Sequence, residues 1–127
     1  MKKNVVDSSG WIEYFSDAEN AHFFSPAIEN TKNLIIPSIS LLEVFKHILR
    51  NRSEKQAFEC ITCMMQGSIV NLDVEISLSA AKLGIQYKIP LADSIILATG
   101  LAHEATVWSQ DADFERLPNV RYINKKY

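Results

Sequence analysis

The stretch Asn4-Val5-Val6-Asp7-Ser8-Ser9-Gly10 places a short apolar segment directly before a group of small polar residues. Valines favour a strand, whereas Asp and Ser are preferred at turns and at the N-termini of helices. Apolar residues then recur at helical spacing from Trp11 to Phe15. These residues therefore predict a strand that leads straight into a helix, which is the repeating unit of α/β folds.

The same alternation continues along the 127 residues. We expect strands over residues 4–6, 33–36, 68–72, 106–109 and 120–123. We expect helices over residues 11–15, 23–28, 40–50, 53–66, 76–87 and 91–103, the second starting near Ser25-Pro26 because proline suits a first helical turn. The pattern predicts a three-layer α/β/α sandwich with a parallel sheet, formed by one domain over residues 1–127.

Composition narrows the possible classes of protein. With 47% hydrophobic and 22% charged residues, the chain has an ordinary globular composition, which excludes a disordered or collagen-like protein. The longest apolar runs are too short to span a membrane, and Asp7 arrives before a signal-peptide core is complete, so we expect a cytoplasmic location. A net charge of −2 gives no overall attraction to nucleic acid, so any such contact has to be local or assisted by a cation.

Several acids occupy positions that folding alone does not require. In open parallel sheets, ligands bind outside the carboxyl ends of the strands. In this chain Asp7 directly follows the first expected strand, and Asp111 and Asp113 follow the fourth. Glu43 interrupts an apolar helical stretch, and Asp93 lies in the most hydrophobic helix. These five acids are candidates for one shared site.

Two of these acids also have purely structural explanations. Asp93 stands in a first helical turn, where a negative charge is favourable. Glu43 has Lys46 and His47 three and four residues away, but such a surface pair is worth only about 0.2–0.5 kcal/mol.

Carboxylates about 6 Å apart repel by roughly 3 kcal/mol at an effective dielectric near 20. A gathered set therefore needs a cation, and Mg²⁺ or Mn²⁺ suits oxygen ligands and assists phosphoryl displacement.

The ordered motifs that contain these acids resemble those of PIN-domain ribonucleases, in particular VapC-type toxins of toxin–antitoxin pairs. The motifs are Asp7-Ser8-Ser9, Glu43 within Ser40-Leu41-Leu42-Glu43, Asp93 within Leu91-Ala92-Asp93-Ser94, and Ser109-Gln110-Asp111-Ala112-Asp113-Phe114. The resemblance covers essentially the whole chain. It departs mildly at Ser109, where the family often has Thr, and the hydroxyl is kept.

The resemblance implies a five-stranded parallel sheet of order 3-2-1-4-5 and a Mg²⁺- or Mn²⁺-dependent endoribonuclease. It implies an acidic catalytic quartet of Asp7, Glu43, Asp93 and Asp111. The metal ligands would be Asp7, Asp93 and Asp111 with Asp113 as a further ligand, and the ranking of Asp111 against Asp113 stays open. Ser9 and Ser109 would support the neighbouring carboxylates. Family members usually form homodimers and are inhibited by a cognate antitoxin protein.

A local basic cluster supplies candidates for RNA contact. Lys46, Arg50 and Arg52 either contact phosphates or form an ordinary polar face. His47 shares a helix face with Glu43 and is either an RNA contact or a solvated histidine.

The two cysteines form a lone C-x-x-C that lacks a second pair of zinc ligands. Cys60 and Cys63 fall in the second half of a predicted helix rather than at its N-terminus, where a redox pair stands. We therefore interpret them as structural thiols.

Three competing functions remain to be tested. A haloacid-dehalogenase phosphatase needs a second Asp where this chain has Ser9. A response-regulator receiver would use Asp73 as phosphoacceptor but lacks the acidic pair near the first strand. The third alternative is a catalytically silent PIN-like module that binds nucleic acid or a partner without cutting.

Overall fold

The computed structural model describes residues 2–126. Its strands are β1 (Asn4–Val6), β2 (Leu34–Pro37), β3 (Ser68–Val70), β4 (Thr106–Ser109) and β5 (Val120–Tyr122). Its helices are α1 (Ser8–Phe15), α2 (Ala21–Glu29), α3 (Ser38–Asn51), α4 (Glu54–Met64), α5 (Val74–Tyr87) and α6 (Leu91–Ala102), with short 3-10 turns η1 (Thr31–Asn33) and η2 (Ala112–Phe114).

The strands form one parallel sheet in the order β3-β2-β1-β4-β5, which confirms the expected order. The central strand β1 pairs with β2 on one side and with β4 on the other. Val5 lies opposite Ile35 of β2 and Val107 of β4. The strand order reverses between β1 and β4, so their carboxyl ends form the crevice in which ligands of such sheets bind.

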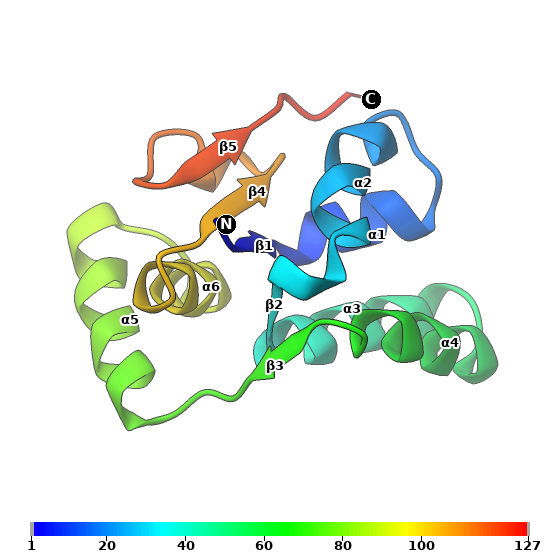
Figure 1. The fold of residues 1–127 in the computed structure, drawn as a ribbon, viewed down its shortest axis with the longest axis horizontal. Coiled ribbons are helices and arrows are strands. Elements are labelled where there is room, and N and C mark those ends of the chain that lie inside the picture. The colour runs from blue at the N-terminus through cyan, green and yellow to red at the C-terminus, as the bar shows by residue number, and fades with distance from the viewer. Residues whose placement is uncertain (1, 127) are drawn as a thin grey trace.

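Helices cover both faces of the sheet, with α5 and α6 on one face and α1 to α4 on the other (Figure 1). The alternation along β1 explains the two cores, because successive strand side chains point to opposite faces. Val5 packs in a cluster with Leu97 of α6, and Val6 packs in a cluster with Trp11 of α1 and Phe24 of α2. The three-layer sandwich is therefore confirmed.

The start of α1 is held close against α2. A Cβ added to Gly10 would lie 2.6 Å from a ring carbon of Phe24. Only glycine allows this approach. The close packing of α1 against α2 brings the end of β1 and the first turn of α1 into the interior.

The expected start of the second helix near Ser25-Pro26 was wrong, because α2 begins at Ala21 and contains Pro26. Asn20, which directly precedes α2, is held by contacts outside the helix: its backbone N–H donates to Glu13 Oε2 at 2.9 Å, and its Nδ2 donates to Gln110 Oε1 at 2.9 Å. The preference of proline for a first turn therefore does not decide where α2 begins.

The other element boundaries differ from expectation by a few residues. The third strand ends at Val70 rather than at Leu72, whose side chain is exposed. The first helix begins at Ser8, directly after Asp7, rather than near Trp11. Within residues 2–126, none of the helices has the length and apolar character needed to cross a membrane.

Candidate active site

The acids of interest come from four separate elements that meet at the carboxyl edge of the sheet. Asp7 follows β1 and caps α1, and Asp111 follows β4 and caps η2. Glu43 comes from α3 and Asp93 from the first turn of α6. Together with Ser8, Ser9 and Ile12 of α1, these four acids line one cavity of about 420 Å³. The structure thus brings the predicted quartet together.

Asp7 is the most enclosed of these carboxylates, with 2% of its surface exposed. Its Oδ1 accepts hydrogen bonds from the Gly10 N–H at 2.9 Å and from Ser9 Oγ at 3.0 Å. Its Oδ2 accepts from Ser109 Oγ at 2.6 Å and from Ser9 Oγ at 3.0 Å. The two predicted supporting serines therefore both contact Asp7.

Ser109 also connects Asp7 to the loop that carries the next acid. Its hydroxyl oxygen donates to Asp7 and accepts a hydrogen bond from the backbone N–H of Asp111 at 2.9 Å. The side chain of Ser109 is fully buried, so this bridge is shielded from water. One hydroxyl thus sets the position of Asp111 relative to Asp7.

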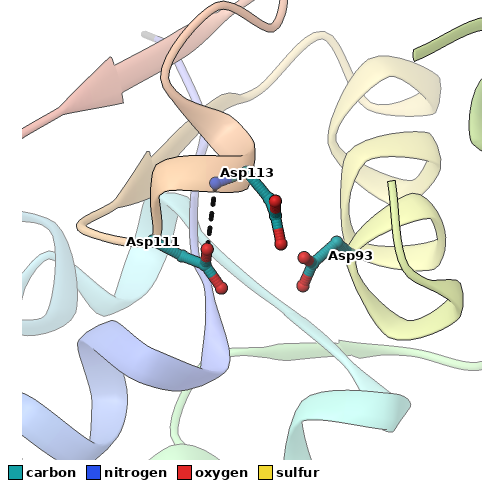
Figure 2. Close-up of side chains that lie close together, drawn as sticks. All are labelled: Asp93, Asp111 and Asp113. Atoms are coloured by element: carbon teal, nitrogen blue, oxygen red, sulfur yellow. Dashed lines mark hydrogen bonds between the residues drawn. The ribbon is translucent and has the colours of Figure 1, made fainter. Parts of the chain in front are cut away.

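Asp93, Asp111 and Asp113 point toward one another from α6 and from the segment after β4 (Figure 2). One carboxylate oxygen from each lies within 4.8 Å of the others, a spacing that can hold a metal ion. Asp111 Oδ1 also accepts the Asp113 N–H at 3.0 Å, which fixes the turn between them. Asp113 therefore belongs to the same cluster as Asp111.

Burial and neighbouring negative charges raise the pKa values of two of these acids. The pKa of Asp93 is raised to about 7, first by burial and then by the charges of Asp111, Asp7, Asp113 and Glu43. Burial also raises the pKa of Asp7 to about 6, although hydrogen bonds from Ser109, Gly10 and Ser9 oppose the rise. Without a bound cation, the site holds protons more tightly than ordinary carboxylates do.

Glu43 is held by a residue whose role the sequence did not reveal. Ser8 Oγ donates to Glu43 Oε1 at 2.6 Å, across 35 residues of sequence. Ser8 is adjacent to Asp7, so α1 positions two of the acids through consecutive residues. This contact favours a role for Glu43 in the site over a simple surface pair with Lys46.

The basic candidates divide into two groups. Lys46, Arg50 and His47 of α3 line the same cavity as the acids. Arg52 does not: it lies beyond the end of α3 beside a different cavity with Phe15, and its Nη2 donates to Ser16 Oγ at 3.4 Å. The structure thus separates Arg52 from the other two predicted RNA contacts.

A buried polar network beside the acids was also missed. Gln110 Nε2 donates to Glu13 Oε1 at 3.0 Å, and Asn20 Nδ2 donates to Gln110 Oε1 at 2.9 Å. All three side chains are buried. Glu13 interrupts an apolar stretch just as Glu43 does, so the same signal points to it; Asn20 and Gln110 carry no such signal in the sequence.

The donor set fits a hard divalent cation. The clustered ligands are carboxylate oxygens, with no sulfur or imidazole among the three, and oxygen-only sites suit Mg²⁺ or Mn²⁺. Asp7 lies at the same cavity, and its charge raises the pKa of Asp93. A cation would remove the repulsion that these shifted pKa values reveal.

The sequence as a whole matches the family model of the PIN domain over residues 5–120. The chain belongs to the PIN domain family. No curated protein matches it in sequence. The expected family is thereby confirmed, and the solved structures similar to this PIN domain include a VapC toxin and toxin–antitoxin complexes.

Three of these solved structures illustrate the likeness. A toxin–antitoxin complex from Klebsiella pneumoniae is 25% identical, with a TM-score of 0.78 over 94% of this chain and 96% of that one. The VapC20 toxin of Mycobacterium tuberculosis, described as cleaving the sarcin–ricin loop, is 12% identical with a TM-score of 0.75, over 91% and 95%. DNA-bound VapBC from Salmonella typhimurium is 15% identical with a TM-score of 0.75, over 98% of each chain.

The structure also places the residues on which the competing interpretations depended. Asp73 caps α5, where it accepts the N–H of Ile76 at 2.8 Å, and it does not line the acidic cavity. Cys60 is buried and Cys63 half-buried on α4, and burial raises the pKa of both thiols. These placements favour neither a phosphoacceptor at Asp73 nor a reactive cysteine pair.

Proposed function

We propose that this PIN domain is a metal-dependent endoribonuclease, the VapC-type toxin of a toxin–antitoxin pair. The observation that carries the proposal is the convergence of Asp93, Asp111 and Asp113 within 4.8 Å beside a cavity that Asp7 and Glu43 also line. An acidic cluster of this kind binds a cation, and a cation allows a negatively charged site to accept an RNA backbone.

We assign Asp93, Asp111, Asp113 and Asp7 to hold Mg²⁺ or Mn²⁺. When bound there, such an ion would polarise a water and offset charge that develops on the phosphate. Asp93, with a pKa of about 7, gives up its proton when the ion binds. Ser9 and Ser109 keep the Asp7 carboxylate in one orientation through hydrogen bonds of 2.6–3.0 Å.

Residues of α1 and α3 complete the reaction site. Ser8 fixes Glu43 through Oε1, and we assign Glu43 Oε2 to accept the proton of the attacking water. Lys46 and Arg50 line the same cavity and supply positive charge for phosphates next to the scissile bond. We do not assign an RNA contact to Arg52, which faces another part of the surface.

The partners follow from the same proposal. Solved structures similar to this chain include toxin–antitoxin complexes, which supports an antitoxin partner. We also propose that residues 1–127 work as one domain, that the protein forms homodimers, and that it acts in the cytoplasm on RNA without a membrane partner.

A cleavage experiment tests the proposal. Purified, antitoxin-free protein is incubated with mixed tRNA and rRNA in Mg²⁺, in Mn²⁺ and in EDTA, beside Asp93→Asn and a control variant, Glu59→Gln, whose carboxylate is exposed on α4. We expect discrete fragments with wild-type and Glu59→Gln protein that disappear in EDTA and with Asp93→Asn.

Metal binding separates the alternatives. Calorimetric titration with Mn²⁺ should show binding to wild-type protein and weaker binding to Asp93→Asn. Binding of Mn²⁺ without cleavage of any RNA would favour the catalytically silent module, and absence of Mn²⁺ binding would refute the metal site itself.

A further inference from the structure

A second cavity of about 480 Å³ adjoins the acids, and no residue of α3 lines it. It shares Ser9 and Asp111 with the first cavity, so the two meet at the acidic cluster. Its lining includes Tyr122 at the end of β5, Lys125 in the segment after β5, and the buried Gln110. Its volume lies within the range of about 300–1,000 Å³ that is typical of small-ligand sites.

The wall of this second cavity is fixed by buried hydrogen bonds. Asn20, which has no exposed surface, donates through Nδ2 to the carbonyl oxygen of Asn124 at 3.0 Å and to Gln110 at 2.9 Å. The N–H of Ile123 donates to the carbonyl oxygen of Ser109 at 3.1 Å. The Glu13–Gln110–Asn20 network therefore holds the segment after β5 against the loop that carries Asp111.

The charges on the two sides are matched to a polyanion that crosses the site. Lys46 and Arg50 stand at the first cavity and Lys125 at the second, with the carboxylates between them. A nucleic-acid strand along this path meets positive charge on each side of the phosphate that reaches the acids. The second cavity adds a partly buried aromatic ring, Tyr122, and bases of single-stranded RNA stack on such rings.

We propose that the second cavity is a nucleotide-binding subsite of the nuclease. A single RNA strand enters along α3, places its scissile phosphate at the acids and continues into the second cavity. There the next base packs on Tyr122 and the following phosphate contacts Lys125. The inference rests on the proposed nuclease function and adds that the substrate is unpaired on this side of the cut, because the base enters the cavity alone.

Binding of short RNA tests this subsite apart from catalysis. The probes are fluorescein-labelled ten-residue oligouridine and oligoadenosine, the same sequences as DNA, and a ten-base-pair RNA duplex. Fluorescence anisotropy is measured in Mn²⁺ with Asp93→Asn protein, which we expect not to cut. We expect the RNA single strands to bind more tightly than the duplex, and the single-stranded DNA measures whether a 2′-hydroxyl contributes to binding.

Variants of the cavity wall are compared in the same background. From the usual strength of base–aromatic stacking, Tyr122→Ala should weaken single-strand binding roughly 5- to 100-fold, and Tyr122→Phe should retain it. Lys125→Ala should weaken binding several-fold and lower the slope of log K against log salt by roughly 1. Lys82→Ala, on the exposed surface of α5, is the matched control and should bind as the parent does.

Photo-crosslinking keeps the test decisive if Tyr122→Ala fails to fold. Oligouridine that contains 4-thiouridine should crosslink to the peptide over residues 117–126 as well as to α3. Crosslinks to α3 alone, or equal affinity of Lys125→Ala and Lys82→Ala, would overturn the subsite. If wild-type protein, with Asp93 intact, still cuts RNA in Mn²⁺, the nuclease assignment would stand without the subsite.

The remaining outcomes also separate the two proposals. Binding that depends on Tyr122 and Lys125 without cleavage by wild-type protein would support the subsite on a silent module. Absence of both RNA binding and cleavage would overturn the subsite together with the nuclease.

Discussion

Replacement of Asp93 by Asn should stabilise the metal-free protein at neutral pH. The pKa of Asp93 is raised to about 7, so its charged form is disfavoured in the folded chain. A rise from 3.8 to about 7 corresponds to roughly 4 kcal/mol for a fully buried group. Asp93 is half-buried, and solvent screening reduces the expected gain to ~1–2 kcal/mol. For a domain of this size that gain raises Tm by roughly 3–8 °C.

The size of this stabilisation depends on pH. The raised pKa means that the folded chain binds this proton more tightly than the unfolded chain does, so the penalty from Asp93 is absent below pH 4. It grows as pH rises from about 4 to about 7 and is complete above that window. The advantage of Asp93→Asn should therefore be near zero at pH 4 and maximal at pH 8.

Thermal unfolding followed by circular dichroism in EDTA, between pH 4 and pH 8, measures this difference. Glu59→Gln, which removes an exposed carboxylate on α4, serves as the control and should leave Tm within about 2 °C. Added Mn²⁺ should make the Tm of the wild type higher than that of Asp93→Asn, because the wild-type site binds the ion more tightly. Equal Tm values for wild type and Asp93→Asn at pH 8 in EDTA would refute the account of charge crowding.

Three further outcomes are expected. Ser109→Ala should lower the rate of cleavage about 10- to 100-fold, because loss of a group that orients a metal ligand typically has an effect of this size. Ser109→Thr keeps the hydroxyl and should retain most of the rate. Equal rates for the two variants would contradict a role for the hydroxyl that joins Asp7 to Asp111. Affinity for Mn²⁺, measured by titration, should rise from pH 5 to pH 8 as Asp7 and Asp93 lose their protons, and a flat profile would show that neither proton is displaced. The double variant Cys60→Ser and Cys63→Ser should cut RNA at the parental rate, and loss of its activity would argue against structural thiols.

The acids could be found from the sequence because each interrupts a pattern. Asp7 and Asp111 end apolar strands, and Glu43 and Asp93 stand among apolar helical residues. The resemblance to PIN-domain ribonucleases supplied the strand order in which β1 and β4 are neighbours, and the structure shows that order. Position in the pattern therefore marked the candidate acids, and the resemblance predicted which of them meet.

Features that depend on side-chain direction or on distant contacts were not predictable. Arg50 and Arg52 are close in sequence, but α3 ends at Asn51 and the non-helical backbone of Arg52 turns its side chain away. The helix that contains Pro26 begins at Ala21, directly after Asn20, whose side chain is hydrogen-bonded to Gln110, 90 residues away. Neither result follows from spacing or composition.

The bond between Ser109 and Asp7 spans 102 residues and has a consequence for synthesis of the protein. A nascent chain cannot form the site until β4 has left the ribosome and inserted beside β1, since neither Asp111 nor Asp113 exists in the emerging chain before then. Contacts between such distant residues form slowly and late in folding. A growing chain therefore carries no assembled acidic site until β4 has paired with β1.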